Sequence, residues 1–179
     1  MNKALLLDRD GIINHDLAYV HKVADFSFTD HIFSLCQQAK ALDYFIIVVT
    51  NQAGIARGLY TEQAVRELHQ WMIAEFKKAD IDIQKAYYCP HHPEHGGLQY
   101  QHNCLCRKPM PGMLLQAKRE FDLDMSQSVM IGDRESDVKA ALAAKVNRRI
   151  LVKSDYTQAD NLDDTAATEI VECLSEIKF

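Results

Sequence analysis

Two aspartates stand two positions apart near the start of the chain, directly after a run of three leucines. Asp8 and Asp10 follow residues 5–7, and Gly11 comes next. A continuous apolar run that ends in turn residues is typical of a strand buried on both faces of a parallel sheet, and ligands of such sheets bind beyond the carboxyl ends of the strands. Strand alternation predicts that both carboxylates point to one side and that Arg9 points away. Such a pair favours a bound cation or a retained proton, because neighbouring like charges disfavour joint ionisation.

An acidic turn after a core strand is the plainer interpretation of this stretch by itself, since Asp-Gly is common turn chemistry. Polar residues elsewhere, at the ends of predicted strands and in the loops that leave them, favour the functional interpretation. Carboxylates that converge suit Mg²⁺, which prefers oxygen ligands, and hydroxyl, amide and cationic groups can hold phosphoryl oxygens. We therefore expect a phosphoryl-transfer site that joins Asp8 and Asp10 to Thr50, Asn51, Arg107, Lys108 and Asp133.

A cluster of cysteines and histidines lies near the middle of the chain. A Cys-x-His followed by a Cys-x-Cys supplies four ligands, enough to close a tetrahedral zinc site. The segment at about 89–106 has little apolar content to hold it in place, and structural zinc in peptides supplies on the order of 10–16 kcal/mol. We expect Zn²⁺ to bind Cys89, His91, Cys104 and Cys106. Free thiols or a redox pair are the alternative, and the spacing leaves the competing ligands His92, His95 and His102 open.

Apolar patterns predict strands and helices that alternate along the chain. We expect strands at 5–7, 44–49, 81–88, 128–131 and 149–152, and helices at 30–42, 61–79, 111–121, 138–145 and 166–177, with Asp30 and Thr61 as N-caps of the first two helices. This order implies one α/β domain with a central parallel sheet and right-handed crossovers. Cys36 and His69 lie on predicted helices, where we expect structural roles. A loop at 14–23 should cover the first strand end, where Asp16, Tyr19 and His21 could contact a ligand, with an ordinary surface loop as the alternative.

The composition is that of a globular protein in a single domain of 179 residues, with 47% hydrophobic and 25% charged residues. A net charge of −5 provides no basic surface of the kind that nucleic-acid binders carry. The apolar runs are too short to span a bilayer and the N-terminus lacks signal-peptide features, so we expect a cytoplasmic protein with no membrane partner. Five cysteines, three of them within 89–106, favour a metal over disulfides in a reducing compartment.

Four motifs in this order resemble those of the haloacid dehalogenase (HAD) superfamily of phosphohydrolases: Asp8-Arg9-Asp10-Gly11, Thr50, Lys108 and Gly132-Asp133. More narrowly, Asp-Arg-Asp-Gly, Thr-Asn-Gln, Cys-Pro-His-His-Pro and Cys-x-Cys-Arg-Lys-Pro-x-Pro-Gly-Met resemble the D-glycero-D-manno-heptose 1,7-bisphosphate 7-phosphatases. The resemblance implies a Rossmann-like HAD fold without a large cap domain, and a zinc-binding loop insertion. It also implies a Mg²⁺-dependent phosphatase whose substrate is a phosphorylated sugar, D-glycero-D-manno-heptose 1,7-bisphosphate. The enzyme would remove the 7-phosphate in the synthesis of ADP- or GDP-heptose precursors of lipopolysaccharide.

The resemblance also implies roles for single residues. Asp8 would be the nucleophile that forms an aspartyl-phosphate, and Asp10 the acid and then the base. Thr50 and Lys108 would stabilise the phosphoryl group, and Mg²⁺ would be held by Asp8, the Asp10 backbone carbonyl and Asp133. Zinc would organise the loop that presents Arg107 and Lys108. Substrate contacts would come from Asp16, Tyr19, Asn51, Gln52, Ala53, Arg107 and Arg134.

Three positions depart from the family pattern, and other functions compete. Ile12 stands where many members have Thr, Ala53 where Ser is frequent, and Arg134 where Lys is common, so the preferred sugar and anomer are left open. Histidinol-phosphate phosphatases share the zinc loop and the chemistry. A signalling receiver domain also combines acids, Thr and Lys at strand ends, but without an Asp-x-Asp after the first strand or a zinc loop. A zinc-stabilised binding module without catalysis is the third alternative. We expect a monomer.

Overall fold

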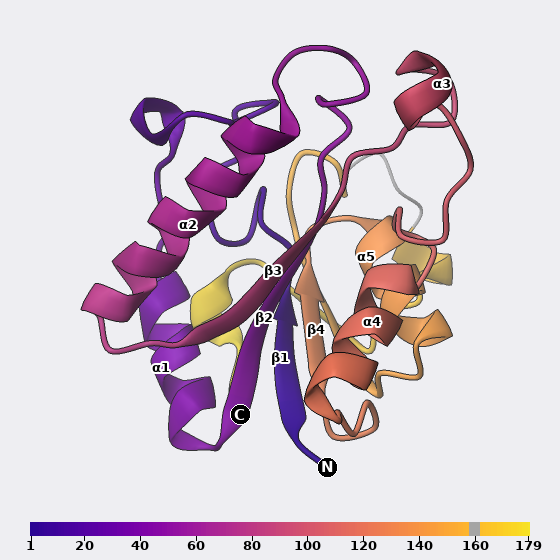
Figure 1. Ribbon diagram of the computed structural model, residues 1–179. Helices are drawn as coiled ribbons and strands as arrows, with labels where there is room; N and C mark the ends of the chain where they lie inside the picture. The colour runs from indigo at the N-terminus through magenta and orange to yellow at the C-terminus, as the bar shows by residue number, and fades with distance from the viewer. Residues whose placement is uncertain (158–161) are drawn as a thin grey trace.

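The computed structural model describes residues 1–157 and 162–179, in which strands and helices alternate around one sheet (Figure 1). The strands are β1 (Lys3–Leu7), β2 (Tyr44–Asn51), β3 (Ile83–Cys89), β4 (Val129–Gly132), β5 (Arg148–Val152) and β6 (Glu169–Val171). The α-helices are α1 (Ile32–Ala41), α2 (Glu62–Lys78), α3 (Gly97–Tyr100), α4 (Gly112–Phe121) and α5 (Glu135–Ala143). Short 3-10 turns occupy Val23–Asp25, Leu162–Asp164 and Leu174–Glu176.

All six strands are parallel, in the order β3-β2-β1-β4-β5-β6, which confirms the expected fold class. The chain therefore winds outward from β1 to β3 and then returns to the centre to continue from β4 to β6. The reversal of direction lies between β1 and β4, where Leu5 pairs with Val129 and Leu7 with Ile131. In doubly wound sheets this is the position at which a crevice opens for ligands.

Alternating residues of the central strands pack against helices on opposite faces. Leu5 and Leu7 belong to the core under α1 and α2, and Leu6 to the core under α4 and α5. Figure 1 shows the same division, with α1 and α2 on one side of the sheet and α4 and α5 on the other. All three leucines are fully buried, and each contributes roughly 1.5–3 kcal/mol by leaving water. The apolar run thus fixes β1 in the centre of the sheet and the residues after it at the carboxyl edge.

The structure corrects two expectations about where helices begin. His31, and not Asp30, is the N-cap of α1, because the chain turns there through a left-handed conformation with φ of 68°. Helix α5 begins at Glu135 rather than at 138, because the side chain of Asp137 accepts a hydrogen bond from the backbone N–H of Arg134 and stabilises an earlier first turn.

The predicted C-terminal helix at 166–177 is wrong. Residues Glu169–Val171 form β6 and pair in parallel with β5. The strand is fixed by contacts with a distant segment, including two hydrogen bonds of 2.6 and 2.9 Å from Arg148 to Glu169. Only a 3-10 turn at Leu174–Glu176 follows. Pairing with β5 has overridden the local apolar spacing that predicted a helix.

Above the carboxyl edge, the described chain contributes loops and the four-residue α3 rather than a cap domain (Figure 1). Helix α3 belongs to the loop between β3 and α4 that carries the Cys/His cluster. No helix in residues 1–157 and 162–179 has the length and apolarity needed to cross a bilayer.

Candidate active site

Asp8 and Asp133 lie side by side at the crevice because β1 and β4 are neighbours. Asp8 follows the last residue of β1, and its backbone N–H donates to the Ile131 carbonyl of β4 at 3.0 Å. Asp133 follows the last residue of β4. Carboxylate oxygens of Asp8, Asp133 and Asp137 lie within 4.8 Å of one another, and all three residues are buried. The strand ends predicted from the sequence therefore bring their acids together.

Lys108 joins the acids of β1 and α5. Its Nζ donates to Asp8 Oδ1 at 2.8 Å and to the Val49 carbonyl at 2.7 Å, and lies 2.7 Å from Asp137 Oδ1. The other oxygen of Asp137 accepts from the Arg134 N–H at 3.0 Å. Because both oxygens of Asp137 are bonded, this residue serves to hold Lys108 and the start of α5.

Asp133 is bonded differently and suits a cation. The residue is 1% exposed, and neither of its carboxylate oxygens has a hydrogen-bond partner among the described residues. Gly11 has a left-handed φ of 88°, and a Cβ at that position would lie 2.3 Å from Asp133 Oδ2. A side chain there would fill the space beside the carboxylate. Two free, buried oxygens next to Asp8 fit Mg²⁺, which requires oxygen ligands.

The charges of the buried acids and of Lys108 also favour a bound cation. Burial and the charge of Asp137 raise the pKa of Asp8 to about 7, although the charge of Lys108 lowers it. Burial is the main reason that the pKa of Asp133 is raised to about 8, and the charges of Asp8 and Asp137 raise it further. Burial disfavours the charge of Lys108, but Asp137 and Asp8 outweigh it and raise the pKa of the amine. One ammonium faces three carboxylates, so a divalent cation would balance the remaining charge.

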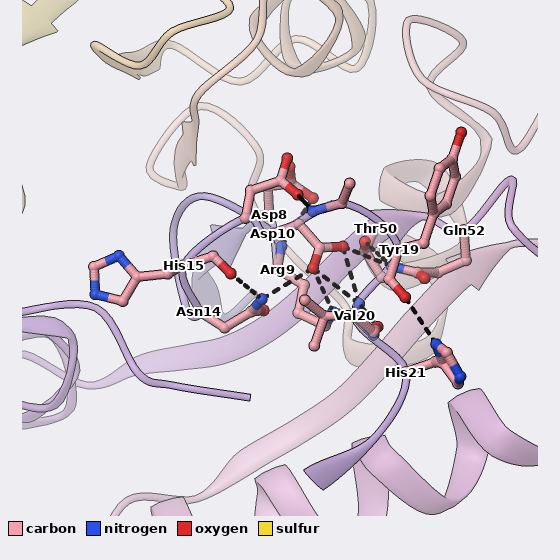
Figure 2. A network of polar contacts seen from close by, with 12 residues as sticks. Asp8, Arg9, Asp10, Asn14, His15, Tyr19, Val20, His21, Thr50 and Gln52 are labelled. Carbon is pink, nitrogen blue, oxygen red and sulfur yellow. Dashed lines mark hydrogen bonds and ion pairs between the residues drawn. The ribbon is translucent and has the colours of Figure 1, made fainter. Parts of the chain in front are cut away.

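Asp10 lies at the centre of a separate network (Figure 2). Its Oδ1 accepts from Arg9 Nη2 at 2.9 Å and from Asn14 Nδ2 at 3.0 Å, and its Oδ2 accepts from Gln52 Nε2 at 2.9 Å. Burial alone would raise the pKa of Asp10, but the charge of Arg9 and the hydrogen bonds outweigh burial and lower it. The expectation that Arg9 points away from Asp10 is wrong, because β1 ends at Leu7 and strand alternation does not extend to these residues.

The turn after β2 brings amide and hydroxyl groups to the same place. Gln52 is 2% exposed, and besides Asp10 it donates to Thr50 Oγ1 at 3.0 Å and accepts from the Tyr60 hydroxyl at 2.7 Å. Asn51 exchanges two hydrogen bonds of 3.0 Å with the backbone of Lys108. The amides thus orient Asp10, Thr50 and Lys108 relative to one another.

A cavity of about 580 Å³ unites these groups. Its lining includes every residue that the sequence predicts to be catalytic or to contact substrate: Asp8, Asp10, Asp16, Tyr19, Thr50, Asn51, Gln52, Ala53, Arg107, Lys108 and Arg134. Asp133 is not part of this lining, but one of its carboxylate oxygens lies within 4.8 Å of one of Asp8.

One side of the mouth is formed by Arg134 and two partners. Arg134 Nη2 lies 3.2 Å from Asp16 Oδ2, and the guanidinium stacks on the Tyr156 ring, with its Cζ 3.6 Å from the ring centroid. Two more cations, Arg57 and Arg107, also line the cavity, together with the imidazole of His92. The mouth therefore offers positive charge and hydrogen-bond donors to a second anionic group on a ligand.

The Cys/His cluster forms beside the cavity as the spacing predicts. Sulfur atoms of Cys89, Cys104 and Cys106 lie 3.0–3.5 Å apart, and His91 Nδ1 lies 3.3 Å from the sulfur of Cys106 and 3.7 Å from that of Cys89. Four donors at such separations surround a point suited to tetrahedral Zn²⁺. His92 faces elsewhere, since its Nδ1 accepts from the Glu94 N–H at 3.0 Å and its ring lies against that of His95, tilted by 36°.

The cluster is joined directly to the cavity. The Arg107 N–H donates to Cys104 Sγ, and Arg107 Nη1 donates to the His91 carbonyl, both at 3.3 Å. Lys108 follows in sequence. A metal bound by the four donors would fix the backbone that carries both cations.

Two of the residues that sequence reasoning missed hold cations of the site. Asp137 lies four residues after Asp133, and a carboxylate in the first turn of a helix after a strand was the available signal. Tyr156 follows β5 in a loop, and its sequence neighbourhood carries no motif that predicts its position at the cavity.

Known proteins resemble the chain over most of its length. A protein-family model described as HAD-hydrolase-like matches residues 105–177. The D-glycero-beta-D-manno-heptose-1,7-bisphosphate 7-phosphatase of Haemophilus influenzae is 45% identical over 86% of this chain and 83% of its own length. The D-glycero-alpha-D-manno-heptose-1,7-bisphosphate 7-phosphatase of Campylobacter jejuni is 49% identical over 88% of this chain and 87% of its own.

The fold of the chain also resembles that of a solved structure. The D,D-heptose 1,7-bisphosphate phosphatase of B. bronchiseptica, in complex with magnesium and phosphate, superposes with a TM-score of 0.79 at 27% identity. The match covers 95% of this chain and 92% of that one.

Proposed function

Because this chain belongs to the heptose-1,7-bisphosphate 7-phosphatase family of HAD phosphatases and is a phosphoric monoester hydrolase, we propose that it removes the 7-phosphate of D-glycero-D-manno-heptose 1,7-bisphosphate. The observation that carries this proposal is that every predicted catalytic and substrate-contacting residue lines one and the same cavity. The product, a heptose 1-phosphate, would serve the synthesis of nucleotide-activated heptose.

Asp8 acts as the nucleophile in this proposal. Its Oδ1 accepts from the Arg9 N–H and from Lys108 Nζ, both at 2.8 Å, which leaves Oδ2 to attack phosphorus. A bond forms between Oδ2 and phosphorus while the bond from phosphorus to the sugar oxygen breaks. The resulting aspartyl-phosphate divides one displacement into two easier steps.

Asp10 transfers the protons. Protonated Asp10 gives its proton to the departing sugar oxygen, and the carboxylate then takes a proton from the water that attacks the phospho-enzyme. That attack releases phosphate and regenerates Asp8. Negative charge of a bound phosphate opposes the effect of Arg9 and favours the protonated form of Asp10 at the start of the reaction.

The transferred phosphoryl group needs positive charge and donors, which Lys108 and the Thr50 hydroxyl provide. Mg²⁺ would be held by Asp8, Asp133 and the Asp10 backbone carbonyl, and would neutralise charge on the phosphoryl oxygens. The free, buried oxygens of Asp133 support this assignment.

Remaining contacts would select the substrate. Arg107 and Arg134 lie at the cavity together with Asp16, Tyr19 and Ala53, and the two arginines suit the second phosphate of a sugar bisphosphate. Structural Zn²⁺, bound by Cys89, His91, Cys104 and Cys106, would hold the loop that carries Arg107 and Lys108.

A phosphate-release assay with added Mg²⁺ tests the proposal. Both anomers of heptose 1,7-bisphosphate, histidinol phosphate and several sugar and nucleotide monophosphates would be compared by kcat/KM. We expect a heptose bisphosphate to be preferred, with heptose 1-phosphate as the product. A large preference for histidinol phosphate, or release of the 1-phosphate, would contradict the proposal.

A further inference from the structure

Arg9 is the largest fully buried side chain of the described chain, with 0% exposure. A buried guanidinium must have partners for its N–H groups, of which it has five. Nη2 donates to Asp10 at 2.9 and 3.0 Å and to the Val20 carbonyl at 2.7 Å, and Nε donates to Asp10 Oδ1 at 3.3 Å. The remaining nitrogen, Nη1, lies 3.3 Å from Nε2 of His69 on α2.

The contact between Arg9 and His69 defines the state of the imidazole. An arginine N–H can only donate, so Nε2 of His69 must be the unprotonated acceptor and the ring proton must lie on Nδ1. Burial and the charge of Arg9 lower the pKa of His69 to about 3, although the charge of Asp10 raises it. The ring is therefore neutral. His69 is 4% exposed and packs edge-on against Tyr88 of β3. It is not among the residues that line the cavity.

These contacts give the guanidinium one orientation. His69 holds Nη1 from α2, and the Val20 carbonyl holds Nη2 from the loop that carries Asp16 and Tyr19. Figure 2 shows Arg9 between Asp10 and Val20. Nη2 then donates to both oxygens of Asp10, and Nε donates to Oδ1. Rotation of the guanidinium would shift the carboxylate relative to Gln52 and Thr50.

We propose that His69 and Arg9 are positioning residues for Asp10: His69 fixes the guanidinium of Arg9, and Arg9 fixes the Asp10 carboxylate beside the nucleophile. The inference rests on the proposed function, in which Asp10 exchanges protons with the leaving group and with water. It assigns a function to a histidine of α2 that has no contact with the cavity. Asp10, Arg9 and Tyr88 are the charged or titratable groups that face its ring.

The test compares a reaction that needs the acid with one that does not. A sugar phosphate has a poor leaving group that requires a proton, whereas p-nitrophenyl phosphate has a leaving group that departs without one. His69→Leu and His69→Phe remove the acceptor, and the phenylalanine keeps a ring beside Tyr88. His69→Gln retains an acceptor for Arg9. Met72→Ala, a fully buried position on the same helix, is the control for loss of stability alone.

We expect His69→Leu and His69→Phe to lower kcat for heptose 1,7-bisphosphate by about 10- to 100-fold with little change in KM, because general acid–base catalysis is worth about 10²–10⁴-fold in all. With p-nitrophenyl phosphate, the two variants should release nitrophenol in the first turnover, measured by rapid quench, within about threefold of the wild-type rate. Their later steady-state rate should fall, because Asp10 is also the base that activates water. His69→Gln should recover most of kcat.

Three results would overturn the inference: unchanged kcat in both apolar variants, equal losses in the first turnover of both substrates as in Met72→Ala, or a His69→Gln enzyme no better than His69→Leu. If the wild-type enzyme with Mg²⁺ released no phosphate from the sugar substrate, the proposed function would fail and this inference with it. Normal wild-type turnover with unaffected His69 variants would overturn the inference alone.

Discussion

Binding of Mg²⁺ should displace protons from the buried acids, and this linkage can be worked out from the structure. Asp8 and Asp133 have pKa values raised to about 7 and about 8. Both carboxyls are therefore largely protonated at pH 6 in the metal-free protein, and a cation must displace those protons. Affinity for Mg²⁺ should rise as the pH increases from 6 to 8.5.

The magnitude follows from the two pKa values. At pH 6 the carboxyls lie about one and two pH units below their pKa values, which weakens binding by roughly 10- and 100-fold. At pH 8.5 this competition nearly disappears. The dissociation constant should thus fall by roughly 100- to 1,000-fold between these pH values, or about 3–4 kcal/mol of binding free energy.

The same shifts fix the sign of the effect on stability. A carboxyl with a raised pKa in the folded protein binds its proton more tightly there than in the unfolded chain. The stability that Asp8 and Asp133 contribute as neutral acids is thus present below about pH 4 and is lost as the pH rises through about 7 and about 8. Added Mg²⁺ should therefore raise the unfolding temperature more at pH 8.5 than at pH 6.

Isothermal titration calorimetry in buffers of different ionisation enthalpy measures both the affinity and the number of protons released. We expect between one and two protons to be released at pH 6, and fewer in Asp133→Asn. Asp122→Asn is the matched control, because Asp122 is an exposed acid at the end of α4 in a left-handed conformation that Asn also adopts. Equal affinities at pH 6 and 8.5, with no proton release, would refute the assignment of these acids to the metal.

Three substitutions test other parts of the site. Asp137→Asn removes the charge that holds Lys108 at 2.7 Å, so kcat should fall by about 100-fold with the fold retained by circular dichroism; an unchanged kcat would show that Lys108 needs no such anchor. Cys104→Ser should release zinc, measured by elemental analysis, and lower the unfolding temperature; full metal content would show that the ligand set is wrong. Tyr156→Ala removes the ring under Arg134 and should raise KM by about 3- to 10-fold at constant kcat, whereas Tyr156→Phe should not; equal KM values in all three enzymes would exclude a role for the stacking.

The central strands and most of the site could be predicted because they depend on local sequence. Long apolar runs specify buried strands, and parallel strands place the residues after them at one edge of the sheet. That geometry brings Asp8, Thr50 and Asp133 together without knowledge of any contact. The four donors of the Cys/His cluster were predictable for a similar reason, since their spacing alone suggests a closed metal site.

Features that depend on distant partners could not be predicted. Strand β6 forms because β5 offers it an edge, and nothing within residues 166–177 reveals that partner. Arg9 is buried because Asp10, Val20 and His69 surround it, although an isolated arginine would favour the surface. Tyr156 reaches Arg134 from a loop whose path the sequence does not specify.

The aspartyl-phosphate on Asp8 is the central claim, and trapping it is the most direct test. An Asp10→Asn enzyme would be mixed with p-nitrophenyl phosphate and Mg²⁺, quenched in acid, reduced with borohydride and digested for peptide mass spectrometry. Loss of the base should let the acyl phosphate accumulate, and reduction should convert Asp8 alone to homoserine. Conversion at Asp133 or Asp137, or a burst of nitrophenol with Asp8 unmodified, would contradict the account.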